Sequence, residues 1–357
     1  MEEKVLTEEE IREKERKERK KRRKYRLLIL LLLLCGTGIM LATSTYAWFT
    51  SNKNVSVNPI TVNIEAKNGI QISADGTNWK SIVQTTDLTS VHSTTYTASV
   101  NQIPDTLEPV STAGIPDANG YLPMYYGTVV TSESTAHNGE YILTAEKTTE
   151  VNGTGTANPD GKFIAFDLFF KVNSATDLYL VSGSGAKTPD VTDTGIKNAS
   201  RIGFVIEGNT TSGDTVANIQ ALNAGTSATS YIWEPNYDVH TAAGVANARD
   251  VYGVTTTQTG GSVLTYSGII APIAAANDIL LGQATEATSS TLFKSVTPTY
   301  TTDVAFATYK QIFSLAAGIT KIRIYMWVEG QDVDCENNAS GGNITFDLKI
   351  STENPTP

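Results

Sequence analysis

The chain is poor in the residues that mark several common classes of protein. Among its 357 residues there are only 2 cysteines and 3 histidines, and charged residues make up 18%. Two cysteines exclude a small scaffold held by many disulfides, so the fold must depend on its hydrophobic core. The low charged fraction, beside 40% hydrophobic residues, excludes a disordered polyelectrolyte. A net charge of −10 argues against a nucleic-acid partner, because such binding needs a basic face.

Familiar catalytic motifs are missing as well. His92, His137 and His240 are scattered and form no H-E-x-x-H motif, so a zincin-type metalloprotease would lack its ligand helix. There is no G-x-S-x-G elbow of a serine hydrolase, and residues 183–187 lack the spacing of a phosphate loop. The paired carboxylates of a glycoside hydrolase need not be adjacent, and nothing in the sequence marks such a pair. We therefore expect a protein that is not an enzyme.

The charge is divided unevenly between two parts of the chain. Residues 1–26 hold 12 Lys/Arg and 8 Glu, a net charge of +4, which leaves 15 Lys/Arg and 29 Asp/Glu, a net charge of −14, for the rest. Within 1–26 the two signs alternate at helical spacing, which predicts a solvated charged helix. The basic residues stand directly before a Leu-rich run. This order predicts that residues 1–26 are a cytoplasmic leader and that the C-terminal part of the chain is exported.

The apolar run and the small residues after it predict a signal peptide over 27–47. The run covers residues 27–42 with one interruption at Thr37, and its 16 residues are short for a membrane span of about 20. Thr45 and Ala47 suit the −3 and −1 positions of a signal-peptidase site, with cleavage before Trp48. The alternative is an uncleaved anchor over 27–49 that holds the protein to the membrane. In either case we expect an extracellular or cell-surface protein that meets a signal peptidase during export.

Beyond the junction, residues 48–357 have the pattern of an exported all-β domain. Short alternating segments are separated by Gly, Asn and Asp turns, as in an antiparallel β-sandwich. Residues 217–225 and 304–315 are each expected to supply a helical turn. The Thr/Ser/Gly/Ala-rich stretch at about 209–300 is expected to form long loops or an insertion. The expected strands lie within 55–65, 69–82, 121–130, 140–145, 162–172, 177–181, 201–206, 321–328 and 343–350.

An acidic segment between the last two expected strands is the best candidate for ligand binding. It contains Glu329, Asp332, Asp334 and Glu336, with three amides among the ten residues 329–338. Carboxylate and amide oxygens are the ligands that Ca²⁺ takes, although the spacing does not match an EF-hand loop. The alternative is an acidic turn whose side chains cap backbone N–H groups. No other cofactor is expected.

Two further features leave alternatives open. Cleavage before Trp48 would leave Cys335 as the only cysteine, which then serves as a small buried hydrophobe or as a reactive thiol. Trp79, Trp233 and the Tyr125-Tyr126 pair suit either a sugar-stacking platform or the packing of a sheet. A surface adhesin, binding a glycan or Ca²⁺ through a β-sandwich, is therefore an alternative function.

The junction residues also carry a resemblance to a known group of proteins. Residues 43–51, TSTYAWFTS, resemble the signal-peptide end of TasA/camelysin-like exported proteins of Gram-positive bacteria, which have a SipW-type signal peptide. Residues 68–80, 233–236 and 327–335 are similar to segments of uncharacterised members. Together these matches cover about a fifth of the chain.

The resemblance implies a jelly-roll-like sandwich at the cell surface or in a biofilm matrix. It also implies self-association, or assembly with other matrix or surface proteins, by donation of an N-terminal strand to the sheet of the next subunit. Here the candidate donor is residues 48–65. The metalloprotease activity attributed to camelysin would be implied too, but this chain lacks the H-E-x-x-H motif. We therefore expect a non-enzymatic structural protein.

Overall fold

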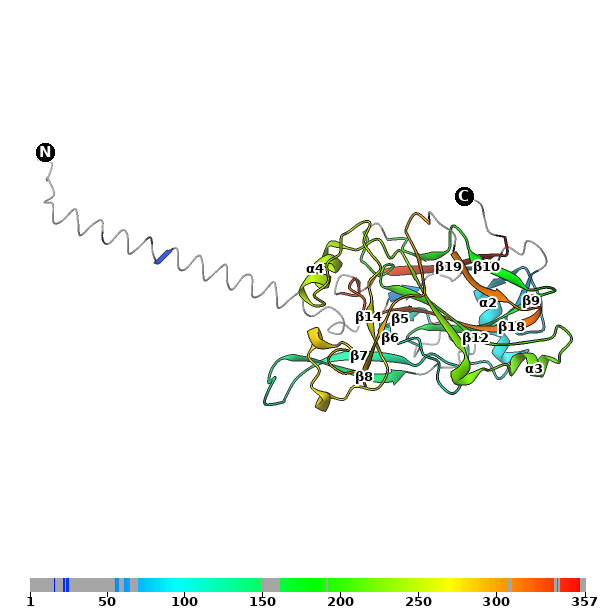
Figure 1. The fold of residues 1–357 in the computed structure, drawn as a ribbon, viewed down its shortest axis with the longest axis horizontal. Helices are drawn as coiled ribbons and strands as arrows, with labels where there is room; N and C mark the ends of the chain where they lie inside the picture. Colours follow the sequence, from blue (N-terminus) through cyan, green and yellow to red (C-terminus); the bar gives the residue numbers. More distant parts are fainter. Residues whose placement is uncertain are drawn as a thin grey trace, which may run out of the picture. The chain divides into compact units, whose positions relative to one another are not determined.

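The computed structural model describes residues 16, 22, 24, 25, 55–57, 61–64, 70–148, 150, 161–190, 192–306, 310–336, 339 and 341–353. The chain divides into two compact units, Met1–Thr45 and Tyr46–Pro357. In the first unit the four described residues are helical and exposed. The second unit is built mainly of strands (Figure 1). The predicted all-β class is therefore confirmed for the second unit.

One large sheet has six strands and contains the most hydrophobic segments of the chain. β9, β18 and β12 are its longest neighbours, and their ladders are antiparallel. They are rich in Ile, Val, Phe and Tyr, which favour strands. The ladder between β12 and β18 is bulged where Gly208, rather than Glu207, pairs with Lys321. In order across the sheet the strands are β16 (Tyr300–Thr302), β13 (Thr229–Pro235), β12 (Ser200–Thr210), β18 (Gly318–Val328), β9 (Ile164–Val172) and β3 (Gln71–Ser73).

The other large sheet has eight strands arranged around the C-terminal strand β19 (Asn343–Ser351). On one side β19 pairs antiparallel with β10 (Thr176–Leu180) and β11 (Gly185–Lys187), and β17 (Lys310–Leu315) pairs with β10. β19 also pairs in parallel with the two N-terminal strands, which in turn pair with two short antiparallel strands. These four strands are β1 (Val55–Val57), β2 (Thr61–Ile64), β4 (Ile82–Gln84) and β5 (Thr106–Leu107).

Two small sheets and several short helices complete the second unit. The small sheets are β6 (Val110–Ser111) with β7 (Met124–Thr131) and β8 (Tyr141–Thr148), and β14 (Tyr266–Ile269) with β15 (Phe293–Val296). The helices are α2 (Thr85–Ser90), α3 (Val216–Gln220) and α4 (Ala242–Asp250), with 3-10 turns η1 (Val91–Ser93), η2 (Gly225–Ser227), η3 (Ala275–Asn277) and η4 (Leu281–Gln283).

Side chains from both large sheets belong to one hydrophobic core. The apolar residues of β9, β12 and β18 cluster with those of β10, β17 and β19. Ring contacts join the two sheets directly, since Phe313 of β17 lies 5.7 Å from Phe204 of β12 and 6.1 Å from Tyr231 of β13 between centroids. In Figure 1, β19 and β10 are drawn above β12 and β18. A second, smaller cluster covers the opposite face of the six-stranded sheet and includes Tyr325 and Trp327.

Three details differ from the sequence-based expectation. Not all ladders are antiparallel, because β1 and β2 run parallel to β19, and β13 runs parallel to β16. The expected helical turn at 304–315 is wrong for its second half, which forms β17 because Ile312, Phe313 and Leu315 are buried in the core. The segment 209–300, expected as loops or an insertion, supplies β13, an interior strand of the six-stranded sheet.

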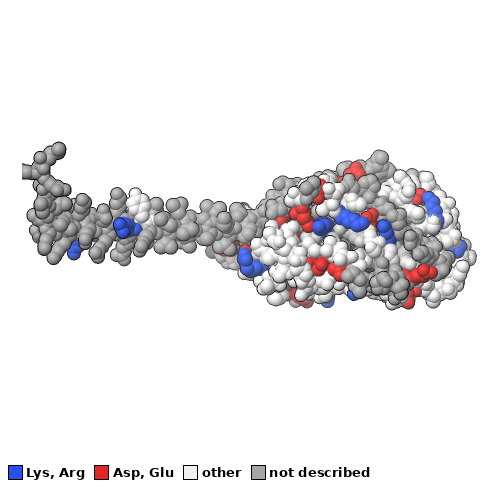
Figure 2. All heavy atoms as spheres, turned by 90° about the horizontal axis from the view of Figure 1, so that it is seen from above, with Lys and Arg blue, Asp and Glu red and all other residues white. Residues whose placement is uncertain are grey.

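The outward surface carries charges of both signs. Viewed from above, Lys/Arg and Asp/Glu side chains are interspersed among uncharged residues on the described surface of the second unit (Figure 2). On β19 the outward residues alternate with buried ones along the strand. On this face the net negative charge of residues 27–357 therefore does not gather into a single acidic patch.

Candidate functional site

The predicted export signals lie outside the described residues. Thr45, Ala47 and Trp48 of the junction, and the whole segment 27–47, are not described by the structure. The same holds for the longer anchor over 27–49. In the portion of the chain that is described, none of the helices combines the length and apolarity that a membrane crossing requires. Cleavage and anchoring both stay predictions.

The acidic segment predicted as a Ca²⁺ site is buried between β18 and β19. Glu329, Asp332, Asp334 and Glu336 are at most 8% exposed. Glu329 accepts hydrogen bonds from the indole Nε1 of Trp327 at 3.0 Å and from the backbone N–H of Gln331 at 3.1 Å. Burial raises the pKa of the Glu329 carboxyl to about 7. This carboxyl is therefore occupied by neighbours on its own chain segment and by Ser111 of β6.

Asp332 is held by a buried arginine from another strand. Arg201 of β12 donates from Nη2 to Asp332 and lies 2.7 Å from Oε1 of Glu234 on β13. All three residues are less than 8% exposed. One cation thus faces two carboxylates, and burial raises the pKa of Glu234 to about 7 in spite of Arg201. Removing one member of such a buried ion pair lowers the stability of the protein, because the remaining charge is left without a partner.

Asp334 is bound by His240 and by the start of α4. Its Oδ2 lies 2.6 Å from Nδ1 of His240, and its Oδ1 accepts the backbone N–H of Thr241 at 2.8 Å. Thr241 is itself the N-cap of α4 and accepts the backbone N–H of Gly244. Burial lowers the pKa of His240, but the hydrogen bond and charge of Asp334 outweigh it, so the pKa is raised.

The four acidic residues consequently do not meet around one point. Asp332 faces Arg201, Asp334 faces His240 and Glu329 faces Trp327. Within the described ranges, no three His, Cys, Asp or Glu side chains form a group that could hold a metal ion. The arrangement instead ties the β18–β19 connection to β12 and α4. Sequence reasoning missed Arg201 and His240, because both are remote in sequence from the acidic segment.

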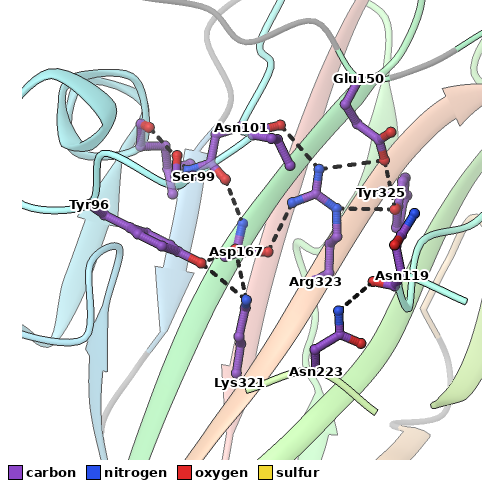
Figure 3. A network of polar contacts seen from close by, with 12 residues as sticks. Tyr96, Ser99, Asn101, Asn119, Glu150, Asp167, Asn223, Lys321, Arg323 and Tyr325 are labelled. Atoms are coloured by element: carbon purple, nitrogen blue, oxygen red, sulfur yellow. Dashed lines mark hydrogen bonds and ion pairs between the residues drawn. The ribbon is translucent and has the colours of Figure 1, made fainter. Parts of the chain in front are cut away.

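A second buried polar group lies on the face of the six-stranded sheet that points away from the main core (Figure 3). Asp167 of β9 accepts from Nη1 of Arg323 at 2.9 Å and lies 3.3 Å from Nζ of Lys321. Tyr96 donates from its hydroxyl to Oδ2 of Asp167 at 2.8 Å. Burial opposes ionisation of Asp167, but Lys321 and Arg323 outweigh it and hold its pKa below the usual range.

Arg323 connects this group to the next part of the sheet. Its Nε donates to the hydroxyl of Tyr325 at 3.0 Å, and its Nη2 lies 3.5 Å from Oε1 of Glu150. Arg323 is fully buried, so its charge depends on these neighbours rather than on water. The sequence held a weak indication that these charges are buried. Lys321 and Arg323 alternate with core residues along β18, and Tyr325 and Trp327 lie on the same face of the strand.

Glu207 of β12 completes this buried face. It is 2% exposed, and neither carboxylate oxygen has a side-chain partner within hydrogen-bond distance. A Cβ added to Gly120 would lie 2.3 Å from Oε2 of Glu207, so the glycine permits a close approach of the covering loop. Burial raises the pKa of Glu207 to about 7, although Lys321 acts in the opposite direction.

The N-terminal strands occupy an interior position in the eight-stranded sheet. β2 pairs with β19 from Thr61 to Ile64 and with β4 on its other side. β1 likewise lies between β19 and β5. The segment closest to the predicted signal junction is therefore bonded through its backbone on both sides. If this segment were removed, the backbone groups of β19 that pair with β1 and β2 would be unpaired, and a gap would remain between β19 and the strands β4 and β5.

A Ser-His-Asp group links the turn between β7 and β8 to Asp278, which directly follows η3. Asp278 accepts from the hydroxyls of Ser132 at 2.5 Å and Ser134 at 2.6 Å, and its Oδ2 lies 2.7 Å from Nδ1 of His137. These hydrogen bonds lower the pKa of Asp278 to about 2. Both hydroxyls donate to the carboxylate rather than to the imidazole, so the nucleophile–base contact of a catalytic triad is not formed. The hydrogen bonds instead hold the turn in place.

A polar pocket of about 280 Å³ opens beside α2. Asp75, in the predicted Asp-Gly turn, accepts the backbone N–H of Asn78 at 2.7 Å and the hydroxyl of Thr95 at 2.6 Å. Burial tends to raise the pKa of Asp75, but the hydrogen bonds lower it by more, to about 2. The pocket is lined by Ala74, Asp75, Asn78, Lys80, Val83, Asp87, Ser90, Val91, Thr94 and Thr95.

Comparisons of the chain with protein-family models, with curated proteins and with solved structures gave no match. The resemblance to TasA/camelysin-like exported proteins stays a prediction carried by residues 43–51 and the three shorter segments.

Proposed function

We propose that the chain is a non-enzymatic structural protein of a cell surface or extracellular matrix, assembled by exchange of its N-terminal strand. Its two large sheets would form a jelly-roll-like β-sandwich around the shared core. Release at the predicted junction before Trp48 would free residues 48–65 to enter the sheet of another copy. The single observation that carries the proposal is the interior position of β1 and β2 between β19 and the strands β4 and β5.

The pairing suits exchange for a physical reason. A strand added to an open edge is held mainly by backbone hydrogen bonds, which any copy of the same segment can supply in the same register. β2 pairs with β19 over four residues and with β4 over three. Each copy would leave a slot and offer a strand. Because slot and strand lie on different surfaces of the subunit once the strand is released, the contact is heterologous and extends into a filament.

The experiment compares two lengths of the protein by electron microscopy. A chain that begins at Trp48 is expected to form filaments, and one that begins at Ala66 is expected to stay unassembled. A synthetic peptide of residues 48–65 should bind the shorter chain and raise its thermal stability. Filaments formed by the shorter chain would contradict strand exchange.

Point variants separate strand exchange from a general loss of solubility. Val62→Pro removes a backbone N–H from β2, which pairs on both sides, and should abolish filaments. Val62→Ala keeps that N–H and is the matched control, so filaments should still form. Equal assembly of both variants would count against a paired strand at this position.

A surface adhesin is a second candidate, favoured by the polar pocket beside α2. Its lining combines carboxylate, amide, ammonium and hydroxyl groups, which suits a small hydroxyl-rich ligand such as a sugar. A glycan array probed with the purified protein, with and without a chelator, tests this function. Binding that Asn78→Ala abolishes would support it, and no binding to any glycan would remove it.

A further inference from the structure

The starting observation is a lysine amine held against a carboxyl group away from water. In the described part of the chain, Lys321 is the only lysine that is buried. Its Nζ lies 3.3 Å from Oδ2 of Asp167, and the two side chains are 9% and 3% exposed. This separation brings Nζ next to the carboxyl group of Asp167, whose carbon Cγ would be the atom attacked. The pair is therefore placed for a reaction as well as for electrostatic attraction.

The fold fixes the two groups in this arrangement. Asp167 stands directly opposite Arg323 in the antiparallel ladder of β9 and β18. Lys321, two residues before Arg323, is its diagonal neighbour on the same face, a position that long side chains reach. Nζ also donates to the hydroxyl of Tyr96 at 3.0 Å (Figure 3). It donates to the backbone oxygen of Gln220 at 3.0 Å as well. The amine has little freedom to turn away from the carboxyl group.

We propose that Lys321 and Asp167 join in an intramolecular isopeptide bond between β9 and β18. A proton first passes from the Lys321 ammonium to the Asp167 carboxylate, which leaves a neutral amine and a neutral acid. The amine nitrogen then attacks Cγ, so that a C–N bond forms while the C–Oδ2 bond breaks. The nitrogen gives up a second proton, and Oδ2 leaves as water. The reaction involves no change of oxidation state and no co-reactant.

The groups around Asp167 match the steps of this condensation. Arg323 donates to Oδ1 at 2.9 Å, where negative charge develops in the tetrahedral intermediate, and so can stabilise that charge. Tyr96 donates to Oδ2, the oxygen that leaves. Low solvent exposure also limits the return of water, which would reverse the reaction.

Glu207 is the positioning residue for the proton transfers. The bulge in β12 places it beside Lys321 on the same buried face, and its two oxygens lack side-chain partners. The Lys321–Asp167 ion pair is the resting state, because Lys321 and Arg323 keep the pKa of Asp167 low. Glu207 has a pKa of about 7 as a result of burial, so near neutral pH it can both supply and accept the protons that the neutral pair requires.

The bond would lock β9 and β18, two neighbouring interior strands of the six-stranded sheet, together. It would close the long loop between residues 167 and 321 and so restrict the unfolded chain, as a disulfide does in a chain with few cysteines. The inference does not depend on strand exchange. A chain that fails to form filaments can still carry the bond, and the two proposals therefore fail separately.

Intact-mass spectrometry of the full chain tests the bond. The measured mass, counted from the N-terminus that peptide sequencing finds, should be lower than the sequence mass by one water molecule. Proteolysis should release two peptides joined through Lys321 and Asp167. A wild-type protein that keeps its full sequence mass after prolonged incubation at neutral pH would overturn the proposal.

Four variants make the test specific. Asp167→Asn should form the same amide with loss of ammonia instead of water, so the mass deficit should change with the leaving group at position 167. Lys321→Arg should keep its full mass. Glu207→Gln should also keep its full mass, whereas Glu207→Asp, which retains a carboxyl, should restore the deficit. A water deficit in Lys321→Arg, or an unchanged water deficit in Asp167→Asn, would place the modification elsewhere and refute the assignment.

The exposed pair Lys187–Asp347 is the matched control. Its Nζ–Oδ2 distance of 2.5 Å is shorter than that of the proposed pair, but the lysine side chain is 50% exposed. Lys187→Arg should therefore leave the wild-type mass deficit unchanged. Loss of the deficit in this variant would show that ion-pair proximity alone, without burial, produces the modification, and would contradict the role given to the buried face.

Discussion

Strands β18 and β19 have the same alternation of polar and apolar residues, but their polar faces lie in different environments. In β19 the polar positions, Asn343, Thr345, Asp347 and Lys349, are partly exposed while the residues between them are buried. In β18 all 11 residues are buried, including Lys321 and Arg323. The alternation therefore predicts which residues share a face of a sheet, but it does not predict whether that face meets water.

The residue types at the polar positions explain the difference. Beside its two cations, the outward face of β18 carries Tyr325 and Trp327, which pack in the second apolar cluster. The outward face of β19 carries only small or charged side chains. A face that includes large aromatic residues gains enough apolar burial to be covered by other segments. Its charged residues are then buried too and need partners, which Asp167 and Glu150 provide.

The largest expected effect comes from breaking the buried pairs of β18. Arg323→Met leaves Asp167 and Glu150 without this cation, and we expect unfolding free energy to fall by about 3–5 kcal/mol, the typical cost of an uncompensated buried charge. Urea denaturation followed by circular dichroism measures the change. Arg323→Lys keeps the charge but loses the planar set of donors, so its loss should be smaller. A loss below about 1 kcal/mol for the methionine variant would mean that this face is hydrated.

Local patterns were enough to predict the strands but not the way they are covered. The turn at Asp75-Gly76 and the strand 343–350 follow from turn chemistry and alternation, and both are present. A helical turn is expected within 304–315, yet residues 310–315 form β17 and Phe313 is buried against rings of the opposite sheet. Such contacts are remote in sequence and override local preference.

The candidate sites show the same limit. The acidic residues from Glu329 to Glu336 were identified from their density along the chain, but Arg201 and His240 lie about a hundred residues away. Without these partners the segment resembles an ion-binding loop. Glu207 is not among the residues that the sequence singles out, because its only distinguishing feature is that it is the one acidic residue in an apolar strand. Pairing across a sheet is decided by register, and register was not deducible from one sequence.

The pH dependence of stability further distinguishes β18 from β19, because a carboxyl group on the covered face of β18 should titrate near neutral pH. Glu329 has a folded-state pKa of about 7, raised by burial from 4.5. Its contribution to stability is fully present below pH 4.5 and is lost as the pH rises through 7. Between pH 5 and pH 8 the protein should lose about 2–3 kcal/mol through this group. Urea midpoints measured at both pH values check the loss.

Glu329→Gln isolates that contribution. The amide oxygen can still accept from Trp327, whereas the side chain can no longer ionise. The variant should be less sensitive to the change from pH 5 to pH 8 than the wild type. An equal pH dependence of the two proteins would show that the titration belongs to other groups, such as Glu234.

The smallest effect is expected on the open face of β19, where the same kind of change breaks a comparable pair. Lys187→Met removes the cation that lies 2.5 Å from Asp347, with the lysine half exposed. Water and salt can replace that cation, so the loss of unfolding free energy should be at most about 1 kcal/mol and should shrink further at high salt. A loss as large as that of Arg323→Met would mean that a second layer covers β19 in solution. When both losses are measured under the same conditions, the difference between them gives the extra free energy that an ion pair contributes on a covered face compared with an open one.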